Sequence, residues 1–397
     1  MRQKDATVLV VILLSQFVTE RKNLLKGKNF SGMIKERGRF VMELTKAQRE
    51  IVETTASSVV VIATAASGKT RCLSERVKWL LAQGVPAEEI VAITFTNAAA
   101  EEIADRVGNP SGLFIGTIHS LANYYLRSGG IDTSRVLNDE RFDDLFKLIK
   151  KHPECIRPVT HLIVDESQDS TPEQFEFLLD MISPKNYMLL GDHRQALYRF
   201  AGATPDYVLG LMESPEVTTY DLNENFRNAP EILSYAQSII RQLGYDYEDY
   251  STPMRTDLRG RVVNVDYSGE GIVRTIQRYV SESKSLYSDW FILTRTNAES
   301  DAIMQVLKRH NVPYDTFKKA QLDNKGLKQK MKENTVKVLT IHTSKGLEAD
   351  NVIVIGARWH DVEEKCIGYV AATRARNLLV WTNKPRTKKP RTEYWGG

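Results

Sequence analysis

The chain has 397 residues, of which 42% are hydrophobic and 26% charged, and its formal net charge is +4. This composition is typical of a soluble globular protein with two or three domains, and a charge so close to balance does not by itself indicate nucleic-acid binding. The three cysteines, Cys72, Cys155 and Cys366, lie far apart, which excludes a disulfide framework and a zinc site and favours a reducing compartment. We therefore expect a cytoplasmic protein.

Both ends of the chain are basic. Residues 1–41 carry nine lysines and arginines against three acidic residues, a net charge of +6. The apolar stretch 6–14 is too short to span a bilayer and no small-residue cleavage site follows it, so no membrane partner is expected. Two interpretations of residues 1–41 stay open: a flexible basic arm, or a reading frame whose start was assigned too far upstream. Residues 384–397 form a proline-broken basic tail that is expected to be disordered, and it either lies against phosphate or keeps the chain soluble.

A phosphate-binding loop is the most informative motif. Residues 59–62 read Val-Val-Val-Ile, as in a buried parallel strand, and Ser67, Gly68, Lys69 and Thr70 follow after a short turn. Such a turn into a helix directs backbone N–H groups and the positive helix end at a polyphosphate. Lys69 adds a point charge, and the Thr70 hydroxyl can bind Mg²⁺. The alternative is a chance match at a helix start. The sequence therefore predicts a nucleoside-triphosphate site.

A pair of carboxylates follows a second apolar run. Residues 162–164 read Leu-Ile-Val, and Asp165 and Glu166 come directly after them. In nucleoside-triphosphate hydrolases the first acid orders Mg²⁺ and the second polarises the attacking water. Alone, such a pair is more often the start of a solvated loop. Together with the phosphate loop it predicts a hydrolytic site.

Strand-like apolar runs alternate with helical stretches along the chain. The pattern is that of a parallel sheet covered by helices and it occurs twice, so we predict an α/β fold with two parallel-sheet lobes. The first lobe is expected over residues 42–215, with a small helical insert at about 122–158, and the second over residues 216–383. The runs are 59–62, 90–94, 162–164 and 187–190 in the first lobe, and 290–293, 336–341 and 352–355 in the second.

Aromatic and polar residues end the strand predicted over residues 90–94. The chain continues Thr94, Phe95, Thr96, Asn97, and Asn97 is predicted to cap a helix that starts at Ala98. Phe95 can stack on a base or pack in the core, and the residues alone leave both interpretations open.

Five further blocks complete a known pattern. They cover residues 116–120, 191–200, 222–227, 340–348 and 369–375. With them the chain closely resembles the superfamily 1 DNA helicases of the UvrD, Rep and PcrA type, in the family's order and over about residues 44–382. The resemblance implies two RecA-like lobes of the P-loop NTPase class, ATP and Mg²⁺ as cofactors, and binding to single-stranded DNA and to junctions between single and double strands. It is also the ground on which we expect the chain to be encoded by a bacterium or a phage.

The resemblance also assigns roles to individual residues. Gln48 would contact the adenine edge, Phe226 would stack on the adenine, and Glu348 would lie near the ribose. Gln195 would sense the γ-phosphate, and Arg227 and Arg374 would reach it across the cleft. The nucleotide-binding loop would comprise Ala65, Ala66, Ser67, Gly68, Lys69, Thr70 and Arg71. Phe95, His119, Tyr198 and Phe200 would stack on single-stranded bases, and Thr94, Asn97, Thr117 and His342 would contact phosphate or sugar.

Two departures from the family pattern shape the functional hypothesis. Thr64 and Ala66 stand where the family has glycines, and only a short lysine-rich segment between Phe317 and Thr335 replaces a large accessory subdomain. The leading hypothesis is a monomeric ATP-dependent translocase and helicase for single-stranded DNA, moving 3′ to 5′, with partners in replication, recombination or repair. The alternative is a degenerate member that binds DNA or a partner with little ATPase activity.

Overall fold

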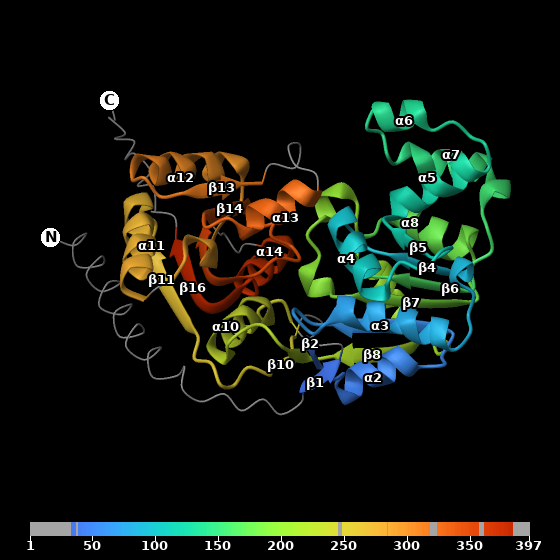
Figure 1. The fold of residues 1–397 in the computed structure, drawn as a ribbon, viewed down its shortest axis with the longest axis horizontal. Coiled ribbons are helices and arrows are strands. Elements are labelled where there is room, and N and C mark those ends of the chain that lie inside the picture. The colour runs from blue at the N-terminus through green and yellow to red at the C-terminus, as the bar shows by residue number, and fades with distance from the viewer. Residues whose placement is uncertain are drawn as a thin grey trace, which may run out of the picture. The chain divides into compact units, whose positions relative to one another are not determined.

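The computed structural model describes residues 33–36, 39–244, 248–283, 285–317, 324–356 and 361–383. They form two compact units, each built around a six-stranded sheet (Figure 1). The first lobe takes the described residues up to Arg227 together with Ile240–Met254, and the second takes Asn228–Ile239 and the described residues from Arg255 onward. The predicted α/β fold with two parallel-sheet lobes is confirmed.

The sheet of the first lobe is parallel throughout, with the strand order β5-β4-β6-β7-β3-β8. Its strands are β3 (Ser58–Ala63), β4 (Ile90–Ile93), β5 (Phe114–Gly116), β6 (His161–Val164), β7 (Asn186–Gly191) and β8 (Thr218–Leu222). The helices are α2 (Lys46–Glu53), α3 (Lys69–Ala82), α4 (Asn97–Val107), α5 (Ile118–Ser128), α6 (Ser134–Asn138), α7 (Asp144–Lys151), α8 (Pro172–Phe175), which a π-helical turn Glu176–Met181 continues, and α9 (Asp206–Met212).

Strand β3 shows why this sheet is buried on both faces. Val59 and Val61 pack in one apolar cluster with residues of α2 and α3, whereas Val60 and Ile62 pack in another with residues of α5 and α7. Because successive side chains of a strand point to opposite faces, a strand covered on both sides is apolar at every position. The phosphate loop therefore begins on a rigid, fully covered strand.

The second lobe repeats this architecture. Its sheet is also parallel, with the order β11-β16-β15-β12-β14-β13. Its strands are β11 (Arg261–Asp266), β12 (Trp290–Thr294), β13 (Tyr314–Thr316), β14 (Val336–Thr340), β15 (Ala349–Ile355) and β16 (Ala375–Asn383). The helices are α10 (Pro230–Arg241), α11 (Gly269–Ser283), α12 (Asn297–Arg309), α13 (Asn324–Lys332) and α14 (Val362–Ala372). Two short parallel strands, β9 (Glu224–Asn225) and β10 (Thr252–Pro253), belong to the first lobe.

The structure corrects the predicted boundary between the lobes. Strand β8 pairs with β3 in the first sheet, so the second lobe starts at Asn228 rather than at residue 216. Strand β8 is not recognisable as an apolar run in the sequence, because it is an edge strand with exposed polar residues and only Leu222 is fully buried. The segment predicted as an insert contains most of α5 together with α6 and α7, which lie together at one end of the first sheet (Figure 1).

The cap of α4 is also corrected. Thr96, not Asn97, is the N-cap, and its hydroxyl accepts a hydrogen bond from the backbone N–H of Ala99 at 3.2 Å. Asn97 is the first helical residue and is exposed.

Part of the basic N-terminal segment carries secondary structure. Strands β1 (Met33–Glu36) and β2 (Arg39–Met42) pair antiparallel. The interpretations of residues 1–32 and of the tail 384–397 fall outside the described residues. Within the part of the chain that the structure describes, no helix is long and apolar enough to cross a membrane.

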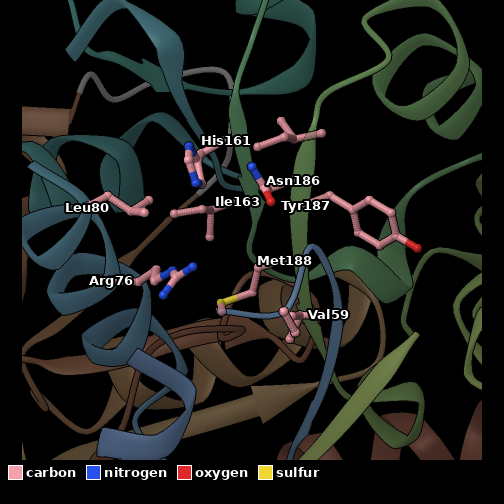
Figure 2. Close-up of a pocket in the computed structure, with 10 residues that line it drawn as sticks. Val59, Arg76, Leu80, His161, Ile163, Asn186, Tyr187 and Met188 are labelled. Carbon is pink, nitrogen blue, oxygen red and sulfur yellow. The ribbon is translucent and has the colours of Figure 1, made fainter. Parts of the chain in front are cut away.

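A small cavity lies at the amino ends of β3, β6 and β7 (Figure 2). Its volume of about 10 Å³ is room for one water molecule. Arg76 lines it and donates hydrogen bonds to the carbonyls of Val52 and Thr54 at 2.9 and 2.6 Å, which ties α3 to the end of α2. Burial lowers the pKa of Arg76 to about 10. This cavity lies at the end of the sheet opposite the phosphate loop and takes no part in the site below.

Candidate functional site

Most of the predicted site residues of the first lobe follow the carboxyl ends of its parallel strands. In an open α/β sheet these ends share one edge, where ligands bind. The loop after β3 continues into α3, whose N-cap Gly68 has a φ of +89°. The backbone conformation favours glycine here, and a Cβ at Gly68 would lie 2.8 Å from Nε2 of Gln48 and would displace that side chain.

The phosphate loop is anchored through its carbonyl groups. Gln48 donates from Nε2 to the Ser67 carbonyl at 3.0 Å, and Asn225 donates from Nδ2 to the Ala65 carbonyl at 2.9 Å. The backbone N–H of Phe226 donates to the Ala66 carbonyl at 3.1 Å. Gln48 and Phe226 were predicted as adenine contacts, and in the structure they hold the loop. Asn225 was not predicted from the sequence, although it lies inside the block that carries Phe226.

The two residues that replace family glycines behave differently. Thr64 is buried, and its backbone N–H and its hydroxyl both donate to the Leu222 carbonyl, at 3.0 and 3.1 Å. This residue anchors the loop to β8 without a positive φ. Ala66, in contrast, has a φ of +59°, a region that costs a residue with a Cβ about 1–2 kcal/mol. The loop therefore adopts its turn with strain at one position.

We expect Ala66→Gly to be more stable than Ala65→Gly by about 1–2 kcal/mol, the strain at a positive φ. Both variants add the same freedom to the unfolded chain, but only residue 66 has a positive φ to relieve. Urea unfolding of the two variants beside the wild-type chain measures the difference. Equal stability of the two variants would contradict the strained conformation of Ala66.

The acidic pair after β6 faces the phosphate loop. Thr70 donates from Oγ1 to Oδ2 of Asp165 at 3.1 Å, and Nζ of Lys69 lies 4.0 Å from Oε1 of Glu166 and donates to the Ala63 carbonyl at 3.3 Å. Burial, followed by the negative charge of Glu166, raises the pKa of Asp165 above its ordinary value. Hydroxyl and carboxylate oxygens are ligands that Mg²⁺ prefers, and it commonly uses one or two carboxylates beside phosphates and water. Thr70 and Asp165 fit that donor set.

The residues after β7 form a buried polar group. Gln195 donates from Nε2 to Oδ2 of Asp192 at 2.8 Å, and Arg194 donates from Nε to Oδ1 of Asp192 at 2.6 Å. Arg194 also donates to the Glu248 carbonyl at 2.9 Å. Burial raises the pKa of Asp192, but the positive charges of Arg194 and Lys69 outweigh it and hold the pKa below its ordinary value. Gln195 was predicted as a site residue, whereas its partner Asp192, and Arg194, which pairs with Asp192, were not.

Three predicted stacking residues gather into one aromatic group. The ring centroids of Phe95 and Tyr198 lie 4.7 Å apart, and those of Tyr198 and Phe200 lie 6.0 Å apart. Phe95 is 38% exposed and Phe200 70%, so Phe95 is a surface residue and not a core residue. Thr94, which precedes Phe95 in the chain, is buried. The aromatic group, Phe95, Tyr198 and Phe200, therefore lies at the surface and is partly exposed.

His119 belongs to a different group. Its Nε2 lies 3.1 Å from Oδ1 of Asp143, and its ring centroid lies 6.1 Å from that of Phe142 and 5.1 Å from that of Phe146. Thr117 caps α5 by accepting a hydrogen bond from the Ser120 N–H at 3.2 Å.

The predicted residues of the second lobe lie around the ends of β14, β15 and α14. Arg374 is 2% exposed and donates from Nε to the Val370 carbonyl at 3.0 Å and from Nη1 to the Leu347 carbonyl at 3.3 Å. Glu348 forms an ion pair with Arg376, a residue that was not predicted from the sequence. His342, in the turn after β14, is half-buried. Arg227 ends the first lobe and is likewise half-buried.

Two family models match the chain. One describes the UvrD/REP helicase N-terminal domain and matches residues 44–154 and 144–216, and the other describes the UvrD-like helicase C-terminal domain and matches residues 220–322 and 315–384. Among curated proteins, the chain is 25% identical over 372 residues to the ATP-dependent DNA helicase Rep of Escherichia coli, covering 69% of this chain and 55% of Rep.

Two other relatives give the same picture. The ATP-dependent DNA helicase PcrA of Staphylococcus epidermidis is 25% identical over 373 residues, and DNA helicase II of Haemophilus influenzae is 23% identical over 374 residues. Each alignment covers 69% of this chain and 51% of the relative. The chain thus spans about half the length of the curated relatives it matches.

Proposed function

Because this chain belongs to the UvrD-like helicases, we propose that it hydrolyses ATP to move along single-stranded DNA. The observation that carries the proposal is the edge of the first sheet. There the phosphate loop faces two carboxylates. Gln195, which Asp192 holds after β7, precedes the exposed ring of Phe200 by five residues in the chain.

In the proposed reaction each residue of the first lobe has one task. Lys69 balances the charge of the phosphates, and Glu166 accepts a proton from the water that attacks the γ-phosphorus while the bond to the bridging oxygen breaks, giving ADP and phosphate. When bound, Mg²⁺ would neutralise charge on the β- and γ-phosphates, with Thr70 and Asp165 as its protein ligands. Gln195 contacts the γ-phosphate and so distinguishes ATP from ADP.

The family resemblance supports further assignments. Gln48 and Phe226 bind the adenine, Glu348 lies near the ribose, and Arg227 and Arg374 stabilise charge on the γ-phosphate in the transition state. The remaining residues of the nucleotide-binding loop, Ala65, Ala66, Ser67, Gly68 and Arg71, surround the phosphates.

For DNA we propose that bases stack on the aromatic group, whose π-faces accept any base and therefore suit a motor that moves along arbitrary sequence. His119 adds a second stacking site, and Thr94, Asn97, Thr117 and His342 contact the sugar–phosphate backbone. Movement is 3′ to 5′ by the family resemblance. The short α13 segment where relatives of this type insert an accessory subdomain favours translocation over processive unwinding.

A degenerate, weakly hydrolysing protein is the second candidate, and Ala66 is the observation that favours it. Strain at a position where the family has glycine can slow the loop's adjustment to phosphates. DNA binding without DNA-stimulated phosphate release would favour this candidate.

Phe200→Ala is expected to weaken affinity for single-stranded DNA by about 1–3 kcal/mol, the value of one stacking platform, and to reduce the movement obtained per ATP. Thymidine and adenine homopolymers should be affected alike, because stacking reads no base edge. Leu286→Ala is the control, since Leu286 is also apolar and 54% exposed but precedes the amino end of β12 in the other lobe. Fluorescence anisotropy on both homopolymers gives the affinities. If Phe200→Ala bound both homopolymers with wild-type affinity, Phe200 would not be a stacking residue for DNA.

Translocation on end-labelled oligothymidylates of increasing length tests the proposal as a whole. We expect the time to reach the 5′ end to grow linearly with length, only in the presence of ATP and Mg²⁺. A time that does not depend on length at either labelled end would contradict directed movement.

A further inference from the structure

We propose that Gln168 is a positioning residue for hydrolysis, which links Glu166 to the segment that carries Gln195. The inference rests on the function proposed above. Gln168 lies in the 3₁₀ turn Ser167–Asp169 and is 1% exposed. A buried amide needs partners for its donor and its acceptor, and each partner of Gln168 belongs to the proposed reaction site.

The donor side of the amide holds Glu166. Nε2 of Gln168 donates to Oε2 of Glu166 at 2.6 Å, while the other carboxylate oxygen, Oε1, lies 4.0 Å from Nζ of Lys69. Glu166 itself has a φ of +55°, an unfavourable backbone conformation for glutamate that its surroundings must maintain. The hydrogen bond therefore fixes which oxygen of Glu166 faces the phosphate loop.

The acceptor side of the amide holds the end of β7. Oε1 of Gln168 accepts a hydrogen bond from the backbone N–H of Asp192 at 3.0 Å, and the carboxylate of Asp192 holds Nε2 of Gln195 at 2.8 Å. Gly191 makes this approach possible, because a Cβ there would lie 2.8 Å from Oε1 of Gln168. One side chain thus connects the end of β6 with the end of β7.

The orientation of the amide follows from its partners. The backbone N–H of Asp192 can only donate, so it must face the oxygen of Gln168, and the ionised carboxylate of Glu166 can only accept, so it must face the nitrogen. Neither partner tolerates the flipped amide. A glutamate at position 168 would keep the shape and the acceptor but would turn an acceptor toward Glu166, and a leucine would offer neither group.

Gln168→Leu and Gln168→Glu test this role. In both variants we expect kcat for DNA-stimulated ATP hydrolysis to fall on the order of 10- to 100-fold, as when a reacting group is misplaced, while nucleotide and DNA affinity stay near wild type. Gln277→Leu is the matched control, because it removes an amide that donates to a backbone carbonyl in the second lobe. Full turnover in Gln168→Glu would overturn the donor role. Lost nucleotide affinity together with a lower melting temperature would also overturn the proposal, by making Gln168 merely structural.

A double-mutant cycle with Glu166→Gln separates positioning from any other effect. If Gln168 acts through Glu166, Gln168→Leu should change kcat little once Glu166 is replaced, because the two losses share one cause. Losses that multiply would overturn the inference. Absence of hydrolysis in the wild-type chain would overturn the proposed function and this inference with it, whereas wild-type hydrolysis with full turnover in Gln168→Leu would overturn this inference alone.

Discussion

Lys69→Ala is expected to reduce ATP turnover on the order of 10²- to 10³-fold, because it removes the positive charge that meets the phosphates. Affinity for single-stranded DNA should stay measurable, since the aromatic group makes no use of this lysine. In the structure Lys69 is buried, donates to the Ala63 carbonyl and lies 4.0 Å from Glu166, so its ammonium group is already held at the loop. Phosphate release at saturating oligothymidylate gives the turnover, and anisotropy gives DNA affinity.

Lys185→Ala is the control for this variant. Lys185 is exposed and directly precedes β7, at the end of the sheet opposite the phosphate loop. It should hydrolyse ATP like the wild-type chain. Wild-type turnover in Lys69→Ala would remove the catalytic assignment of the phosphate loop.

Glu166→Gln should lower turnover by about 10²- to 10⁴-fold, the range of a general base, and should leave ATP affinity nearly unchanged. The amide keeps the size of the side chain but cannot accept the proton of the attacking water. A single-turnover measurement with labelled ATP separates this chemical step from binding. The effect should appear in the rate of hydrolysis and not in the concentration of ATP that saturates it.

Glu53→Gln makes the same chemical change at the exposed end of α2 and should have no effect. If Glu166→Gln kept its rate but bound ATP poorly, Glu166 would serve binding and the general base would have to be another group.

The sequence predicts the parts of the site that are local in the chain. The strand before Ala63 and the loop to Thr70 are contiguous, as are the strand before Asp165 and the acidic pair. Their apolar runs follow from burial on both faces of a parallel sheet, so composition alone reveals them. Phe95 stayed ambiguous because an aromatic residue at a strand end can point either way, and only its 38% exposure decides.

The parts that the sequence misses depend on contacts between distant residues. Asn225 holds a loop 160 positions before it, and Gln168 meets Asp192 across 24 positions. No periodicity records such pairs. The predicted boundary at residue 215 was wrong for a related reason. Strand β8 is a polar edge strand, and only its pairing with the distant strand β3 shows that it belongs to the first sheet. The cap of α4 shifts by one residue because Thr96 and Asn97 are both good caps, and the backbone decides between them.

The rate of phosphate release from ATP, measured with the wild-type chain in the presence and absence of single-stranded DNA, decides whether this chain couples ATP hydrolysis to DNA. We expect slow release without DNA and a strong increase, with saturation, as oligothymidylate is added in the presence of Mg²⁺. DNA binding with no increase in phosphate release would contradict it and would favour a protein that binds DNA without using ATP to move.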